Sequence, residues 1–339
     1  MITEDEVWNH LDALAKPRRS LGTLETLAVR LATIQQRLDP ATRPRRIVLF
    51  AGDHGVVADG VSAWPSEVTG LMVGTILAGR ATSSVFAAAH RCDLRLVDVG
   101  GLAPSPEAAP DFFRDGRVAP GTKSLAHGPA MTIAEFDAAW AVGAEEADHA
   151  VADGYRLLIA GEMGIGNTTP AACLTALLTG SSPVEATGPG AGAGEDVVAI
   201  KARIVATATA RAAALLVDDP RAAIAEVCGY EIVAMAGFFA RGAELGAALL
   251  LDGYVATSAA LIAERLAPGT ARSMIAGHKS AEPGHAAALD ALGLEPLLDW
   301  GMRLGEGTGA LVALPLVDAA AALLTGVARL DELGVGRED

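Results

Sequence analysis

The chain has 339 residues, a formal net charge of −15 and a sequence pI of about 4.9. At roughly 100–200 residues per domain, this length predicts one large domain or two unequal ones. The acidic balance, with no basic stripe interleaved with aromatic residues, disfavours nucleic-acid binding. Hydrophobic residues make up 51% of the chain, so a large core can be buried and a disordered protein is excluded.

Three widely spaced cysteines, Cys92, Cys173 and Cys228, form neither a CxxC pair nor a disulfide framework. This usage is typical of a reducing compartment, and the acidic N-terminus lacks a signal-peptide pattern. The longest uncharged stretch, residues 163–184, contains Asn167, a proline and several small polar residues. Because these residues argue against a membrane span, we expect a soluble, cytoplasmic protein.

The predicted elements begin with helices. Within residues 3–40, leucines recur at three- to four-residue spacing, which predicts helical structure with a break at Pro17. The run from Ile47 to Gly52 then predicts a buried parallel strand. Further strands of the same kind are predicted within residues 94–101, 155–164, 248–266 and 272–280, whereas residues 231–240 predict a loop that enters a helix.

Alanine-rich helices are predicted between these strands, at residues 132–152, 195–217 and 284–292, and residues 308–334 return to a helical period. Strands that alternate with helices predict an α/β fold with a mainly parallel sheet. The helical ends, residues 1–40 and 308–339, are expected to form a small helical domain. Residues 41–307 would then form the large α/β catalytic domain.

In such sheets, ligands bind at the carboxyl ends of the strands. Asp53 and His54 directly follow the first predicted strand. They could line a substrate site, or Asp53 could cap the next helix and tie down the loop. No further ligand lies nearby at a suitable spacing, so we predict no metal site.

The segment GEMGIGNTTPAA contains Glu162, Gly164, Gly166, Asn167 and Thr168. Its glycines let the backbone approach a ligand, and the backbone amides at the start of the following helix suit a phosphate. Its glycine spacing differs from the dinucleotide motif G-x-G-x-x-G, and no Gly-Lys-Ser/Thr follows. The alternative is an ordinary strand-to-helix turn.

A second glycine-rich segment, residues 188–201, leads into a helix that carries Lys201. Only four of the 26 basic residues are lysines, and a lysine supplies a compact charge that could reach a phosphate or a ribose. The alternative is a solvated lysine paired with Asp196 or Asp219. The nearby LLVDDP, residues 215–220, lacks a following phosphate loop and is interpreted as a helix end and turn.

Two late segments concentrate polar residues. AGHKSAEPGH places His278, Ser280, Glu282 and His285 after a predicted strand, but its spacing is not that of the zinc motif H-E-x-x-H. In RLGEGTGA, Glu306 stands between two glycines, so its own neighbours shield its carboxylate poorly. That arrangement suits a general base held in a cavity, although a turn glutamate that faces water would show the same pattern.

Together and in this order, these segments resemble the nicotinate-nucleotide–dimethylbenzimidazole phosphoribosyltransferase family. The resemblance extends from Lys16 to Val335 and is strongest in GEMGIGNTT, LDGYVATSAAL and HKSAEPGHAAALDALGLEPLLDWGMRLGEGTGA. It implies a homodimer whose subunits have a parallel-sheet, Rossmann-like large domain and a small helical domain built from both termini. It also implies that nicotinate mononucleotide and 5,6-dimethylbenzimidazole react to give α-ribazole 5′-phosphate and nicotinate, with no cofactor or metal.

The resemblance assigns roles to individual residues. Glu306 would be the catalytic base, and Glu162 would lie near the ribose and the acceptor. Arg303, beside Leu304, would meet the nicotinate carboxylate. Asp53 and His54 would shape the edge of the site, and the nucleotide phosphate would be held by Gly164, Gly166, Asn167, Thr168, Lys201 and Ser280.

The sequence departs from the family pattern at several positions. Arg18 and Arg19 stand where Pro-Gly is usual, and Ser124 stands where Asn is common. Trp64 and Met72 would make an apolar wall that favours a flat aromatic acceptor, which could be dimethylbenzimidazole, another benzimidazole, adenine or a phenol. Rival hypotheses are a transferase that uses ribose pyrophosphate with Mg²⁺, a catalytically silent sensor of an aromatic base or nucleotide, and a nicotinamide oxidoreductase.

Overall fold

The computed structural model describes residues 1–106 and 108–334. Its centre is a six-stranded sheet with the strand order β3-β2-β1-β4-β5-β6, in which every neighbouring pair is parallel. The chain winds outward in both directions from β1 and β4, so these neighbours mark the switch point at which doubly wound sheets bind ligands. The strands are β1 (Arg45–Gly52), β2 (Asp93–Gly100), β3 (Phe113–Asp115), β4 (Leu157–Met163), β5 (Ala248–Leu251) and β6 (Met274–Ala276).

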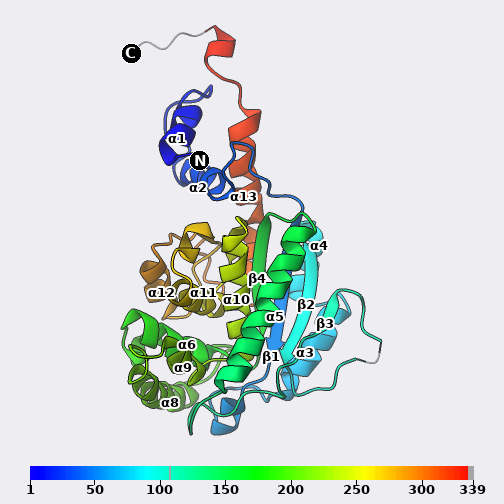
Figure 1. Cartoon of the computed structure of the whole chain (residues 1–339), viewed down its shortest axis with the longest axis vertical. Helices are drawn as coiled ribbons and strands as arrows, with labels where there is room; N and C mark the ends of the chain where they lie inside the picture. The colour runs from blue at the N-terminus through cyan, green and yellow to red at the C-terminus, as the bar shows by residue number, and fades with distance from the viewer. Residues whose placement is uncertain (107, 335–339) are drawn as a thin grey trace.

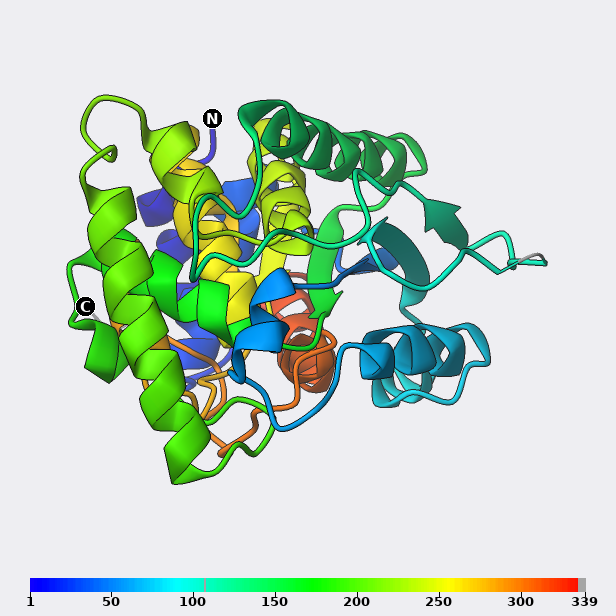
Figure 2. The same ribbon diagram turned by 90° about the horizontal axis from the view of Figure 1, so that it is seen from below.

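Helices cover both faces of the sheet (Figure 1). Viewed from below, the loops at the carboxyl edge of the sheet lie between α8 on one side and the pair α3 and α4 on the other (Figure 2). The α-helices are α1 (Glu4–Asp12), α2 (Thr23–Gln35), α3 (Glu67–Leu77), α4 (Thr82–Ala89), α5 (Ile133–Ala152), α6 (Thr168–Thr179), α7 (Pro183–Ala186), α8 (Glu195–Ala213), α9 (Pro220–Ala225), α10 (Tyr230–Glu244), α11 (Tyr254–Leu266), α12 (His285–Leu292) and α13 (Thr308–Gly326).

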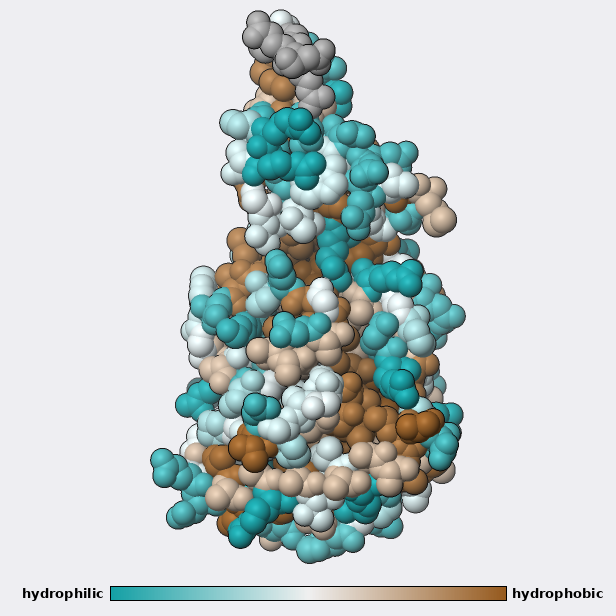
Figure 3. Space-filling view, turned by 90° about the vertical axis from the view of Figure 1, so that its left-hand side faces the viewer, coloured by the Kyte–Doolittle hydropathy of each residue, from teal (hydrophilic) through white to brown (hydrophobic). Residues whose placement is uncertain are grey.

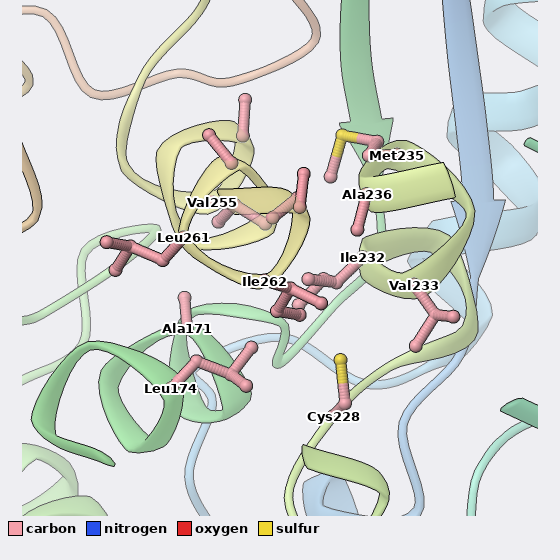
Figure 4. Close-up of a cluster of buried hydrophobic side chains, with 14 of the residues drawn as sticks. Ala171, Leu174, Cys228, Ile232, Val233, Met235, Ala236, Val255, Leu261 and Ile262 are labelled. Carbon is pink, nitrogen blue, oxygen red and sulfur yellow. The ribbon is translucent and has the colours of Figure 1, made fainter. Parts of the chain in front are cut away.

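Alternate residues of the strands feed two separate cores, because successive side chains of a strand point to opposite faces. Val48 and Phe50 join the core that contains α5, α6, α10 and α11. Ile47 and Leu49 join the core formed with α2 and α13. Figure 4 shows part of the first core, where side chains of α6, α10 and α11 point toward one another.

Close helix packing in the first core depends on glycine. A Cβ atom added to Gly143 of α5 would lie 1.7 Å from the carbonyl oxygen of Ala234 in α10. One added to Gly237 of α10 would lie 2.2 Å from the carbonyl oxygen of Trp140 in α5. Both distances are far below van der Waals contact, so each helix needs a glycine where it crosses the other.

The terminal helices lie together at one end of the molecule, where α1 and α2 pack beside the distal part of α13 (Figure 1). Val7, Leu11 and Leu27 are buried there with Leu323 and Leu324. This packing accords with the expected grouping of the chain ends, although the division into two domains stays a prediction. Residues 335–339 of the predicted small domain lie outside the described residues.

Within the described residues, two helical segments are apolar and long enough to cross a membrane by length and composition, residues 67–89 and 308–326. The first is interrupted, since α3 ends at Leu77 and α4 begins at Thr82. In the second, 56% of the 18-residue apolar stretch is buried inside the molecule, as in a core helix. The uncharged stretch from residue 163 to 184 contains only one helix longer than a single turn, the 12-residue α6.

Most predicted elements are confirmed, although helices α3, α4, α7 and α9 have no counterpart among the predicted elements. Residues 231–240 are fully helical within α10, and the short strand β3 has no counterpart among the predicted elements. The helical period at the C-terminus ends at Gly326 instead of residue 334. The LLVDDP segment is a turn after α8, as predicted, and its Asp219 also caps α9 by accepting a hydrogen bond from the Ala222 amide.

Candidate active site

A cavity of about 430 Å³ opens at the carboxyl ends of the central strands. Four carboxyl side chains line it beside several apolar side chains, those of Glu162, Asp252, Glu282 and Glu306. Most of the predicted site residues line this cavity, namely Trp64, Met72, Glu162, Gly164, Gly166, Asn167, Thr168, Ser280, Arg303, Leu304 and Glu306. A pocket of this size, mostly apolar with a few convergent polar groups, is typical of a small-molecule site.

The β4–α6 loop provides the first wall. Glu162 is the penultimate residue of β4, and its carboxyl accepts a hydrogen bond from Asn167 Nδ2. Burial, followed by the charges of Asp252 and Glu231, raises the pKa of Glu162 to about 8. Gly164 must be small, because an added Cβ atom would lie 2.5 Å from the Gly52 carbonyl oxygen. The loop therefore presents a carboxyl that keeps its proton at neutral pH.

Lys201 lies directly behind the start of α6. Its side chain projects from α8 and is 1% exposed. Its Nζ donates hydrogen bonds to Thr168 Oγ1 at 2.6 Å and to the Gly188 carbonyl oxygen at 3.0 Å. Burial lowers the pKa of Lys201 to about 8. The amino group thus adds positive charge at a helix N-terminus, where an anion is favoured.

Glu306 stands on a left-handed turn immediately before α13. Its φ is 57°, and the flanking Gly305 and Gly307 have φ values of 91° and 72°. Gly305 cannot carry a side chain, because an added Cβ atom would lie 2.2 Å from Glu162 Oε1. Left-handed backbone is uncommon at a non-glycine residue and is often found at functional sites.

Asp252 secures this turn from the end of β5. Its Oδ2 accepts a 3.0 Å hydrogen bond from the Gly307 amide, and its Oδ1 accepts a 2.7 Å bond from the Gly309 amide. Burial raises the pKa of Asp252, but the hydrogen bond and charge of His278 and the helix amides outweigh it, so the net shift is downward. Asp252 therefore caps α13 with a negative charge.

The loop after β6 contributes Ser280 and Glu282 to the cavity. The Ser280 amide donates to Nδ1 of His285, and Nε2 of His285 lies 2.8 Å from Thr257 Oγ1. Burial, together with the charge of His278, lowers the pKa of His285 to about 3, so the ring is neutral and acts as a brace. Among residues 1–106 and 108–334, no cluster of three or more His, Cys, Asp or Glu could hold a metal.

The mouth of the cavity is lined by larger side chains. Trp64 is 51% exposed, and its indole Nε1 donates a 3.2 Å hydrogen bond to the Ala191 carbonyl oxygen. Met72 lies on α3, and Leu304 is 57% exposed. Arg303 Nη1 donates a 3.0 Å hydrogen bond to the Gly190 carbonyl oxygen. These contacts anchor the rim while leaving apolar surface toward the cavity.

Asp53 and His54 lie outside the residues that line this cavity. His54 Nε2 is 2.8 Å from Glu231 Oε1, and both side chains are buried. Burial lowers the pKa of His54, but the Glu231 carboxylate and Asp53 outweigh it and raise the pKa overall. Asp53 accepts a hydrogen bond from the Leu102 amide. The pair thus ties the β1 loop to its neighbours.

Sequence reasoning misses three residues of this region. Asp252 follows β5 just as Glu162 lies at the end of β4, so the same signal, an acid at a strand end, could have identified it. The sequence pattern marks Glu231 only as the start of a loop. Ser83 has no signal at all, because it is an uncharged helix residue 223 positions from its partner Glu306.

Known proteins share the sequence and the fold of this chain. A family model described as Phosphoribosyltransferase matches residues 2–335. A protein of Thermus thermophilus named nicotinate-nucleotide–dimethylbenzimidazole phosphoribosyltransferase is 47% identical over 96% of each chain. Relatives of the same name from Solidesulfovibrio magneticus and Mycobacterium tuberculosis are 45% and 46% identical over 96% of this chain, and cover 92% and 89% of their own lengths.

The crystal structure of CobT from Thermus thermophilus superimposes with a TM-score of 0.93 at 46% sequence identity, over 99% of both chains. Sequence and fold therefore agree over nearly the full length, and the α/β fold class is confirmed. The chain belongs to the phosphoribosyltransferase family whose members include the enzymes named nicotinate-nucleotide–dimethylbenzimidazole phosphoribosyltransferase.

Proposed function

We propose that this enzyme transfers the phosphoribosyl group of nicotinate mononucleotide to 5,6-dimethylbenzimidazole or a related aromatic base. The products are α-ribazole 5′-phosphate and nicotinate, in assembly of the cobalamin nucleotide loop. One observation carries the proposal: the same cavity has a lysine-supported helix N-terminus on one side and the buried carboxylate of Glu306 on the other. The helix N-terminus suits the phosphate of the nucleotide, and the carboxylate suits the removal of a proton from the aromatic acceptor.

The donor phosphate is assigned to the start of α6. Thr168 and the preceding glycines Gly164 and Gly166 leave backbone amides accessible there, and Lys201 contributes charge through its contact with Thr168. Ser280 adds a hydroxyl from the loop after β6. Asn167 donates a hydrogen bond to Glu162. The raised pKa of Glu162 supports assigning its protonated carboxyl as a hydrogen-bond donor near the ribose and the acceptor. Arg303 at the rim is assigned to the nicotinate carboxylate.

The chemistry balances without a further reactant. The acceptor nitrogen forms a bond to C1′, and the bond between C1′ and the nicotinate nitrogen breaks. The bonding electron pair returns to the pyridinium ring, which leaves as a neutral pyridine and needs no general acid. The benzimidazole loses its N–H proton to Glu306, which acts as general base. Attack from the face opposite the departing nicotinate inverts C1′ from β to α.

The acceptor is assigned to the apolar side of the cavity, beside Trp64, Met72 and Leu304. A tryptophan ring and a flexible thioether favour a flat aromatic ligand. Asp53 and His54 are assigned a supporting role at the edge of the site, because their contacts fix the loop that leads to Trp64.

We further propose that the enzyme is a homodimer in the cytoplasm and that residues 1–40 and 308–339 form its small domain. Exposed apolar side chains support self-association: Leu71 is 69% exposed on α3, Val85 is 52% exposed on α4, and Trp300 is 67% exposed. On the face shown in Figure 3, hydrophobic residues gather below the terminal helices and again lower on the body. Light scattering after gel filtration would give the mass of the assembly.

The test of the reaction is mass spectrometry of products. Purified protein is incubated with nicotinate mononucleotide and dimethylbenzimidazole, benzimidazole, adenine or p-cresol, without added metal. We expect an α-ribotide and an equal amount of released nicotinate, with a ranking of acceptors. Folded protein that forms no product with any acceptor would contradict the proposal. Turnover only with ribose pyrophosphate and Mg²⁺ would assign a different transferase reaction.

A further inference from the structure

The carboxylate of Glu306 is held by a residue that no sequence motif singles out. Oε2 of Glu306 accepts a 2.9 Å hydrogen bond from Ser83 Oγ and a 3.4 Å bond from the Ser83 amide. Ser83 is fully buried and is the second residue of α4. Both donors belong to the first turn of a helix, where an anion is stabilised by the helix dipole.

The main chain of Glu306 is fixed independently of its side chain. Asp252 accepts hydrogen bonds from the amides of Gly307 and Gly309, and the Thr308 hydroxyl donates a 2.7 Å bond to the Gly305 carbonyl oxygen. These contacts hold the left-handed turn. They do not set the direction of the carboxylate, which still has freedom about its side-chain torsions.

We propose that Ser83 is a positioning residue for the base of the phosphoribosyl transfer. Both of its hydrogen bonds end on Oε2, so Oε1 is the oxygen presented to the acceptor N–H. This inference rests on the proposed function of Glu306, and it identifies the element that orients the base.

The placement of α4 supports this role. The preceding helix α3 carries Met72 on the wall of the cavity, and Thr69 Oγ1 of α3 accepts a 3.1 Å hydrogen bond from the Ile165 amide. The hydroxyl of Ser84 donates a 3.2 Å bond to the Ile76 carbonyl oxygen and joins α4 to α3. The pair of helices therefore links the acceptor side of the cavity to the carboxylate that takes the acceptor's proton.

The test combines Ser83→Ala with Glu306→Gln in a double-mutant cycle. Ser83→Ala removes the hydroxyl and leaves the amide. We expect kcat to fall about 10-fold, the scale of one hydrogen bond to a charged group, while KM for nicotinate mononucleotide stays within about twofold.

In the Glu306→Gln background, the same Ser83→Ala change should have no further effect on single-turnover rate, because the group it orients is absent. Thr75→Ala is the matched control, since this hydroxyl donates a 2.8 Å bond to the Leu71 carbonyl oxygen within α3 instead of to Glu306. Its kcat should stay at the wild-type level. Thermal unfolding of each variant verifies that it is folded.

The outcomes separate the two hypotheses. If Glu306→Gln keeps wild-type turnover, the assignment of the base fails. If Glu306→Gln is impaired but Ser83→Ala has wild-type kcat, the role of Ser83 fails alone. A loss of kcat that is equally large in both backgrounds would also overturn it, because Ser83 would then act through the general fold.

Discussion

The ammonium group of Lys201 donates a 2.6 Å hydrogen bond to the side-chain hydroxyl of Thr168 and so brings α8 to the first residue of α6. The two residues are 33 positions apart in the chain, and the lysine is almost fully enclosed. Burial of an amino group is costly. The charge of the nearby Glu282 offsets part of that cost, and an anion bound at the start of α6 would offset more of it. We therefore expect Lys201 to strengthen the binding of the donor nucleotide.

We expect Lys201→Met to raise KM for nicotinate mononucleotide about 10- to 100-fold, the scale of a lost charge-assisted hydrogen bond. The effect on kcat should be smaller, because the phosphate does not take part in bond breaking. Steady-state kinetics measures both constants. Lys279→Met is the control, since Lys279 is exposed and pairs with Asp299; an equal effect in both variants would argue against a phosphate site at Lys201.

The same lysine predicts a pH dependence. Because the pKa of Lys201 is lowered to about 8, the group is charged below that pH and neutral above it. The value of kcat/KM for the nucleotide, which reports the free enzyme, should therefore fall as pH rises through about 8. In Lys201→Met this alkaline limb should become shallower, with the part that comes from Glu162, whose pKa is also about 8, retained. A limb that persists unchanged in the variant would assign it to another group.

The raised pKa of Glu162 predicts that the free energy of unfolding depends on pH. Its carboxyl has an ordinary pKa of 4.5, raised to about 8 in the folded protein by burial and by the nearby acids Asp252 and Glu231. Between these values the unfolded chain releases a proton that the folded chain keeps. The contribution of Glu162 to stability therefore decreases as pH rises from about 5 to about 8.

Glu162→Gln keeps an oxygen for Asn167 and cannot ionise. We expect the variant to gain stability relative to wild type as pH rises over this range, measured by urea unfolding at several pH values. Glu295→Gln, at an exposed position, should follow the wild-type curve. If the Glu162→Gln and wild-type curves stay parallel, the carboxyl does not retain its proton in the folded state.

Glu306→Gln tests the base directly. We expect turnover to fall by about 10²–10⁴-fold, the usual range for a lost general base, with nucleotide binding preserved because Glu306 does not contact the phosphate loop. Isothermal titration with nicotinate mononucleotide measures the binding. A variant that also loses binding would indicate that the turn itself has collapsed.

Asp252→Asn should destabilise the protein by about 2–4 kcal/mol. An asparagine side chain has one accepting oxygen instead of two, so a buried backbone amide loses its hydrogen-bond partner. Urea unfolding gives this free energy. Asp290→Asn, an exposed change on α12, should lie within about 0.5 kcal/mol of wild type. A similarly small effect at Asp252 would mean that the turn around Glu306 is held mainly by other contacts.

Much of the fold follows from local patterns. The apolar run at β1 and the glycines that end β2 and β4 have strong sequence signals, and so does the alternation with helices. β3 has only three residues and joins the sheet through backbone pairing with Leu96 to Asp98. A segment that short carries no periodicity, so its place depends on the finished sheet. The loop predicted at residues 231–240 is wrong because packing against α5, not local propensity, favours a helix there.

Some residues of the site could be predicted from the sequence, whereas others depend on long-range packing. Glu162, Asn167 and Glu306 stand beside glycines at predicted strand ends or turns, and the structure brings them to one cavity. Lys201 lies behind that cavity, and its partner Thr168 is known only once α8 is packed on α6. Ser83 depends on long-range packing alone, since nothing in its own helix distinguishes it from Ser84.

Helix α13 begins two residues after Glu306 and ends among the terminal helices. Its 19 residues correspond to a rod of about 28 Å at 1.5 Å per residue. One helix therefore joins the turn that carries Glu306 to the terminal helices. Pro315 lies in the interior of this helix and cannot donate a backbone hydrogen bond, so a bend between the two ends would be centred there.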